Sequence, residues 1–495
     1  MSMQTPSLAL ADSDEEISRF LAGEDKQHAL EQLSILFLKD RDFRYLLACA
    51  RLLRHFEPYL AYHHDALWRI IGSTAAGNEN DRAALRQRIM YEEVGPSYLR
   101  VAQRLADTCR FPPRTPLGPR RPRLLYVAHV IKPGDHSPSM EAFEFSLALE
   151  RQFDVDIMLL DARTFPRERA SDFVGAVWQH TDRSPGFGRM GAKNRSVLTY
   201  TATNQGMSTE KIVECIRAAL QFNPDYVITQ GNCNLIGDLL AQHFPAVCME
   251  MSRAEPISRA PTFILFEDIV RELQLPTTGL LPHMPKIRRL RSIMPIREKA
   301  VIYTRERFGL AGDQIVYVVV GYRLPVEITD AFEAVMARIL EAVPCAVIFT
   351  VGVKRDYRHP VLKALPERLP HFNFEPELRS LLALCDCYLN PPRQGGGTSA
   401  LIALNEDVPV LSLGNSDVGG VVGAEHTVAD LDALAERAIR IGLDPAARSA
   451  ARAEARGILT SAPRFEESIA ELWSALVESR EDFEIERARG GLRTA

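Results

Sequence analysis

Three consecutive glycines and two hydroxyl side chains stand between a short apolar strand and a helical run. They lie in NPPRQGGGTSALIALNEDVPVLSLG, residues 390–414, as Gly395, Gly396, Gly397, Thr398 and Ser399. The first turn of a helix carries unpaired N–H groups and a partial positive charge, and glycine lets an anion approach the backbone. Thr398 and Ser399 can cap that helix, donate hydroxyl groups to the anion, or do both. The segment predicts an anion-binding turn, with an ordinary capped turn as the alternative.

Three further polar residues follow predicted strands in the same half of the chain. Arg323 comes directly after VYVVVGY, where an arginine can bind a diphosphate through two parallel hydrogen bonds. Lys354 follows IFTVGV and offers a second cation, and Asp417 in GNSDVGG can accept hydrogen bonds from ligand hydroxyl groups. A surface salt bridge, a solvated lysine and a plain turn are the respective alternatives.

Polar loops also follow two strands in the first half of the chain. The loop HVIKPGDHSPSM contains Asp135 and His136, and either side chain can act as a general base or simply form a polar turn. The loop TQGNCNLIGDLL contains Gln230, Asn232 and Asn234, which can hydrogen-bond ligand hydroxyl groups. Capping of the following helix by asparagine is the structural alternative.

The sequence gives little support for a metal centre. The DVD at Asp154–Asp156 alternates within a strand, so we interpret these aspartates as turn and strand-edge residues. No GxxxxGK[ST] is present and no GxGxxG opens the first strand, which argues against a P-loop and a dinucleotide fingerprint. Backbone N–H groups and cationic side chains must then stabilise any anionic leaving group.

The elements that position these residues alternate between strands and helices. Strand-like runs RLLYVAHV, DVDIMLLD, DYVITQ and AVCMEM are separated by helical runs, which predicts a parallel sheet covered on both faces. Residues 180–205, rich in Gly, Ser, Thr and Asn, are predicted to form a long loop or insertion. Since ligands of such sheets bind at the carboxyl ends of the strands, the polar loops belong at that edge.

The alternation restarts after residue 300 with QIVYVVVGY, CAVIFTVG, CDCYLN and VPVLSL as strands. A last helix is predicted over residues 464–479, followed by a charged tail that we expect to be disordered. In front of both α/β segments, residues 13–110 have apolar residues at helical spacing, and the proline-rich linker at 110–123 separates them from the rest.

The glycine-rich segment resembles the C-terminal domain of nucleotide-sugar glycosyltransferases with the GT-B fold. CDCYLNPPRQGGGTSALIALNEDVPVLSLGNSDVGG has their strand, Gly-rich turn, helix, VPV strand and glycine-containing loop. HFNFEPELRSLLALCDCYLNP resembles the preceding part, where a short loop receives the nucleotide base, and VYVVVGYRL resembles the opening strand. The resemblance is good across residues 314–425, looser across 120–295, and absent from the helical N-terminal region.

One departure concerns the stereochemistry of the reaction. Alignment on VPV places Gln394 and Ile402 where many retaining members carry a pair of glutamates. The pattern is closer to inverting relatives such as the protein-glycosylating branch. It also removes the glutamate that usually binds ribose.

The resemblance implies an α/β, GT-B-like fold, with two Rossmann-like doubly wound domains facing a cleft behind an all-helical N-terminal region. Residues 1–115 would form the helical domain and 116–295 the acceptor-side domain. Residues 296–495 would form the nucleotide-sugar-binding domain, with a C-terminal helix and a charged tail. The expected activity is transfer of a sugar from a nucleoside-diphosphate sugar to a protein or glycan acceptor, without metal or cofactor.

The same resemblance assigns roles to the polar residues. Asp135 or His136 would be the catalytic base toward the acceptor. The predicted substrate-binding residues are Arg323, Lys354, Gly395, Gly396, Gly397, Thr398, Ser399, Asp417, Gln230 and Asn232. The diphosphate would lie against Gly395–Ser399.

Two other functions remain open. A nucleotide-sugar epimerase would use the same fold without an acceptor. A catalytically inactive GT-B-like adaptor would bind a partner glycosyltransferase, which the missing glutamates favour and the Gly-rich turn and Arg323 oppose. The helical N-terminal region is predicted to bind a protein or polymer acceptor or to form a homo-oligomer.

Composition sets the remaining bounds. The chain has 495 residues, which predicts two or three domains, and its formal net charge of −5 gives no general attraction to nucleic acid or anionic membranes. Eight scattered cysteines without a CxxC pair fit a reducing compartment. With no signal-peptide pattern at the start and no apolar run of ~20 residues, we predict a cytoplasmic protein without a transmembrane segment.

Overall fold

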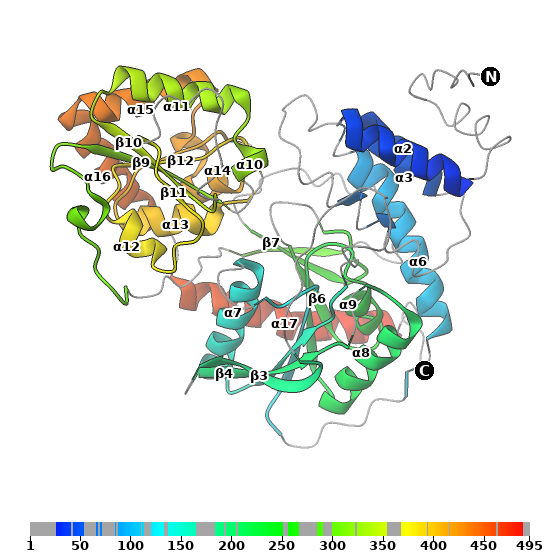
Figure 1. The fold of residues 1–495 in the computed structure, drawn as a ribbon. Coiled ribbons are helices and arrows are strands. Elements are labelled where there is room, and N and C mark those ends of the chain that lie inside the picture. Colours follow the sequence, from blue (N-terminus) through cyan, green and yellow to red (C-terminus); the bar gives the residue numbers. More distant parts are fainter. Residues whose placement is uncertain are drawn as a thin grey trace, which may run out of the picture.

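A computed structural model shows a helical N-terminal region and two β-sheets, each packed against helices (Figure 1). It describes residues 26–40, 43–53, 66–67, 70–71, 85, 88–109, 111–112, 120–132, 137–164, 184–192, 195–203, 206–250, 256–266, 285–290, 299–321, 324–353, 368–393, 395–414, 416–461 and 464–488. Among these residues no helix combines the length and the apolar character needed to cross a bilayer.

Within the described ranges the first sheet has eight strands, in the order β3-β4-β2-β1-β5-β6-β7-β8. All neighbouring pairs are parallel except β3 with β4. The strands are β1 Arg123–Ala128, β2 Asp156–Asp161, β3 Gly186–Ala192, β4 Arg195–Thr201, β5 Tyr226–Gln230, β6 Ala246–Met249, β7 Thr262–Phe266 and β8 Lys286–Leu290. The parallel sheet predicted from the apolar runs is confirmed.

Helices cover both faces of this sheet. Leu124, Tyr126 and Ala128 of β1 pack toward α7 (Ser137–Phe153) and α17 (Phe465–Ala488). Leu125 and Val127, which alternate with them, pack into the cluster that contains α8 (Thr209–Phe222), α9 (Leu235–Leu240) and the N-terminal helices. Because successive side chains of a strand point to opposite faces, a wholly apolar strand needs a layer on each side.

The predicted long loop at residues 180–205 is wrong for its described part. Gly186–Ala192 and Arg195–Thr201 form the antiparallel pair β3 and β4 at the edge of the sheet. In β4 the side chains of Val197, Thr199 and Thr201 are buried while the intervening residues are more exposed. This two-residue period is the signature of a half-buried strand, and the surrounding Gly, Ser and Asn residues obscured it.

The second sheet is entirely parallel, with the order β11-β10-β9-β12-β13. Its strands are β9 Ile315–Val320, β10 Ala346–Val351, β11 His371–Phe372, β12 Cys387–Leu389 and β13 Val410–Leu411. The helices around it are α10 Leu324–Glu327, α11 Asp330–Ala342, α12 Leu378–Leu382, α13 Gly397–Asn405, α14 Asp417–Val422, α15 Leu431–Leu443 and α16 Pro445–Ser461. Two separate apolar clusters lie against its two faces.

The last helix, α17, packs on the first sheet and not on the second (Figure 1). Ile469, Leu472 and Leu476 enter the core under β1, and Trp473 stacks on Phe153 of α7 with ring centroids 5.1 Å apart. The predicted division placed this helix with residues 296–495. The helix also continues to Ala488, so the start of the predicted disordered tail is helical.

The N-terminal region contains α2 Lys26–Asp40, α3 Phe43–Leu53, the π-helical η2 Arg88–Val94 and α6 Gly95–Thr108. The hydroxyl group of Tyr98 on α6 donates a hydrogen bond of 2.5 Å to the buried carboxylate of Asp238 on α9. Asp238 also accepts from the Ser258 hydroxyl and from the backbone N–H of Arg259. Burial raises the pKa of Asp238 to about 6, even though all three donors favour its charged form.

Replacing Tyr98 by phenylalanine is expected to lower the free energy of unfolding by about 1–3 kcal/mol, because a buried acceptor loses a donor. Urea denaturation at pH 7.5, where Asp238 is charged, measures this loss. Tyr45→Phe changes a partly buried tyrosine of α3 in the same way and serves as the control. Equal stability of the two variants would contradict an anchoring role for the Tyr98–Asp238 bond.

Candidate functional site

The glycine-rich turn begins helix α13, and no described side chain accepts from the first N–H groups of this helix. Gly395 and Gly396 have φ angles of 105° and 90°, which only glycine adopts readily, and Gly396 is the residue before the helix. No side chain of the described residues caps this helix start. By contrast, α8, α11, α14 and α15 begin after side chains that accept an N–H bond, namely Ser208, Thr329, Ser416 and Asp430.

Thr398 and Ser399 lie inside the first turn of α13, so neither is the capping residue that the sequence left open. The Ser399 hydroxyl donates to the carbonyl of Gly396 at 2.9 Å and lies 2.9 Å from the Tyr388 hydroxyl. Since the proton of Ser399 is used toward Gly396, Tyr388 is the donor in the second contact. The turn is therefore held from within by a serine and a tyrosine.

Arg393 fixes the turn to the edge of the sheet, and the sequence analysis missed it. Its buried guanidinium donates to Glu327 on α10 at 2.8 Å and to the carbonyl of Val320 at the end of β9 at 2.6 Å. It also donates to the Tyr388 hydroxyl at 3.1 Å and to Asn390 Oδ1 at 2.9 Å. Hydrogen bonds thus run from Arg393 through Tyr388 and Ser399 to the start of α13.

Two glycines make room for this guanidinium. A Cβ atom at Gly321 would lie 2.1 Å from Arg393 Nη1, and one at Gly396 would lie 2.6 Å from Nη2. Gly396 is therefore required by its backbone conformation and by its neighbour, apart from any ligand. The sequence signal that could have revealed Arg393 is its place between an apolar strand and the glycines.

The second sheet also brings Asp417 to the turn. Asp417 is the first residue of α14, and a Cβ atom at Gly397 would lie 3.7 Å from the Cβ atom of Asp417. Strands β12 and β13 are parallel neighbours, so the helices that follow them start at the same edge of the sheet. Arg323 and Lys354 lie outside the described residues.

In the first domain, the sequence-predicted base candidates Asp135 and His136 lie outside the described residues. His129 from the same loop is buried, with Nδ1 2.7 Å from Thr164 Oγ1 and Nε2 2.9 Å from the carbonyl of Asn232. Because a carbonyl can only accept, Nε2 carries the proton and Nδ1 accepts from the threonine. Burial lowers the pKa of His129 to about 4, so this histidine is neutral and joins the loops after β1, β2 and β5.

The loop after β5 is engaged mainly with the protein itself. Asn234 caps α9 through Gly237 and donates to the carbonyl of Val127, which confirms the capping alternative for this asparagine. Asn232 Oδ1 accepts from the N–H of Ile257 at 2.9 Å. A contact of Asn232 with substrate stays a prediction.

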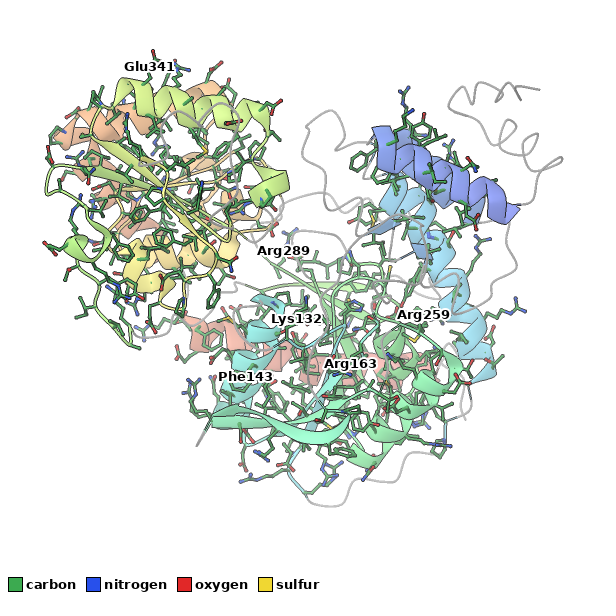
Figure 2. All side chains as sticks on the ribbon, in the orientation of Figure 1. Lys132, Phe143, Arg163, Arg259, Arg289 and Glu341 are labelled. Atoms are coloured by element: carbon green, nitrogen blue, oxygen red, sulfur yellow. The ribbon has the colours of Figure 1, made fainter. Side chains whose placement is uncertain are left out.

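Gln230, whose contact with substrate stays a prediction, lies beside Glu141, which the sequence did not single out. Gln230 is buried at the end of β5, and its Nε2 donates to the carbonyl of Pro138 at 2.9 Å and lies 3.5 Å from Glu141 Oε1. Glu141 is a partly buried residue of α7, and burial raises its pKa to about 7. Lys132, labelled in Figure 2, donates its backbone N–H to Ser139 Oγ on α7, and burial lowers the pKa of its ammonium group.

The DVD aspartates lie at the opposite edge. Asp154 pairs with Arg121 at 2.7 Å, and Asp156 opens β2 with Arg123 at 3.9 Å. Asp154 has a positive φ of 51°, as a turn residue before a strand can have. The structure supports their interpretation as turn and strand-edge residues.

Comparison with known proteins places the fold. No family model and no curated protein sequence matches the chain. Among solved structures, a mutant O-GlcNAc transferase of Thermobaculum terrenum matches with a TM-score of 0.52 and 16% identity, over 95% of this chain and 96% of that one. A glycosyltransferase of Rickettsia africae matches with a TM-score of 0.51 and 10% identity, over 72% of this chain and 98% of that one. The chain therefore has a two-domain GT-B-like fold behind a helical N-terminal region.

Proposed function

We propose that the chain is a metal-independent glycosyltransferase that moves a sugar from a nucleoside-diphosphate sugar to a protein or glycan acceptor. The observation that carries this proposal is the open start of α13, set at the carboxyl ends of parallel strands in a GT-B-like fold. Its N–H groups converge where an anion can lie, and the surrounding bonds are made before any ligand arrives.

In this proposal the second domain binds the donor. The N–H groups of Gly397, Thr398 and Ser399 receive the diphosphate, and Asp417 beside them accepts a hydroxyl of the sugar or ribose. Arg323 and Lys354 are proposed to supply the cationic charge that stabilises the leaving diphosphate. Arg393 does not contact the donor; it holds the turn in its bound shape.

The first domain and the helical region are proposed to receive the acceptor. The Thermobaculum relative is an O-GlcNAc transferase and matches along 95% of this chain, including its N-terminal part. That relation makes N-acetylglucosamine the first sugar to test in the donor. It also makes a protein hydroxyl the first acceptor to test.

Thermal unfolding against a panel of nucleoside diphosphates and their sugars, with EDTA present, tests the donor site. A ligand at about a hundred times its Kd adds ~2.7 kcal/mol to the native state, which raises Tm by a few degrees or less in a chain of this size. We expect one base to raise Tm both as the diphosphate and as the sugar.

The outcomes separate the three functions. Donor binding with sugar release to an acceptor or to water supports the transferase. Conversion of the donor to its epimer without release would identify an epimerase instead. A panel that leaves Tm unchanged throughout would favour the adaptor.

A further inference from the structure

We propose that Glu141 is the general base that removes the proton from the acceptor hydroxyl group. This inference rests on the proposed glycosyltransferase function and adds to it the residue that performs the proton transfer. Glu141 lies in the part of the chain that the structure describes, whereas Asp135 and His136, the candidates predicted from the sequence, do not.

The topology puts Glu141 at the edge where ligands of α/β sheets bind. It lies within the second turn of α7, the helix that follows β1, and β1 pairs in parallel with β5. Gln230 is the last residue of β5. The two side chains therefore reach each other across the carboxyl ends of adjacent strands. They belong to the first domain, whereas the glycine-rich turn belongs to the second.

Gln230 orients the carboxyl group. Its Nε2 is held by the carbonyl of Pro138 in the first turn of α7 and points toward Glu141 Oε1. One carboxyl oxygen is thus directed to the protein interior. The described residues show no partner for the other oxygen, Oε2, and the side chain keeps part of its exposure to solvent. A base needs this combination of a fixed orientation and access to the substrate.

The electrostatic setting suits a base that works near neutral pH. Burial is the largest influence on Glu141 and raises its pKa to about 7, while the Gln230 amide lowers it. Among the described residues, Tyr126 of β1 is a titratable side chain that interacts with the charge of Glu141. Its own pKa is raised by burial and then by the charge of Glu141. A tyrosine this far above its ordinary pKa stays neutral, so it does not compete for the proton.

The step balances without any further reactant. The acceptor oxygen forms a bond to the anomeric carbon as its proton passes to the Glu141 carboxylate. The bond from that carbon to the diphosphate oxygen breaks, and its electron pair stays on the leaving diphosphate. Glu141 then returns the proton to solvent.

The test compares Glu141→Gln with Glu150→Gln, an exposed carboxyl on the same helix. The substrate is the nucleotide sugar that raises Tm in the wild-type protein, and the readout is release of the nucleoside diphosphate, with water or a serine peptide as acceptor. We expect Glu141→Gln to lower kcat about 10²–10⁴-fold and to leave the Tm shift by the diphosphate unchanged. Glu150→Gln is expected to match the wild type.

The pH profile distinguishes a base from a structural carboxyl. Because the deprotonated form is active, wild-type kcat/KM is expected to rise with pH through about 7 and then level off. The rise should be absent from the residual activity of Glu141→Gln.

Activity and a pH profile equal to wild type in Glu141→Gln would overturn the inference while the transferase stands. Asp135→Asn and His136→Asn would then be the next variants. A wild-type protein that binds no diphosphate would instead remove the proposed function itself.

Discussion

Arg393→Met is expected to lower the free energy of unfolding by about 3–5 kcal/mol, the usual cost of removing one partner from a buried ion pair. The guanidinium is buried and joins Glu327, Val320, Tyr388 and Asn390. Without it, the buried carboxylate of Glu327 loses the guanidinium that donates to it at 2.8 Å. Urea denaturation followed by circular dichroism measures the loss.

Two comparisons make this result specific. Arg456→Met breaks an exposed pair with Asp407, which solvent screens, and is expected to lower the free energy of unfolding far less. Adding Glu327→Gln to Arg393→Met removes a buried negative charge and should restore part of the stability. A loss in Arg393→Met no larger than in Arg456→Met would show that the buried pair contributes little.

Gly396→Val is expected to weaken binding of the nucleoside diphosphate at least about 100-fold, equal to ~2.7 kcal/mol. Valine does not tolerate a φ of 90°, and its Cβ would lie 2.6 Å from Arg393 Nη2, so the turn must change shape. The first N–H groups of α13 then no longer converge on one point. Isothermal titration with the diphosphate that raises Tm measures the loss.

The control for this variant is Gly457→Val, at a helical position where a Cβ atom meets nothing within 4 Å. It should bind the diphosphate as the wild type does. Retained affinity in a folded Gly396→Val protein would mean that the diphosphate binds elsewhere.

Much of the fold could be predicted because buried parallel strands appear in the sequence as short apolar runs. IVYVVV and AVIFTV are completely buried strands of the second sheet, and their short length and β-branched residues favour a strand over a helix. A last helix over residues 464–479 was also predicted from the sequence. The sequence does not show which sheet this helix packs against, so the packing of α17 on the first domain required the structure.

The site was predictable only where its residues are close in the sequence. Gly395–Ser399 are consecutive, and the positive φ angles of Gly395 and Gly396 fit their residue type. The role of Arg393 depends on its hydrogen bonds to Val320 and Glu327, which are 73 and 66 positions away in the sequence. The proposed role of Glu141 depends on its burial beside Gln230, which is 89 positions away in the sequence. Contacts of this range depend on strand order, which local patterns do not specify.

The position of α17 has a consequence for how the protein is made. Synthesis proceeds from the N-terminus, so β1 through β8 leave the ribosome well before residues 465–488 do. Until then the apolar side chains in contact with Leu472 and Leu476 lack that part of their cover, and of the two helices in this cluster only α7 is present. The second domain, whose strands and surrounding helices are contiguous from residue 299 to 461, can complete its core first. The domain translated earlier is therefore the one that finishes folding last.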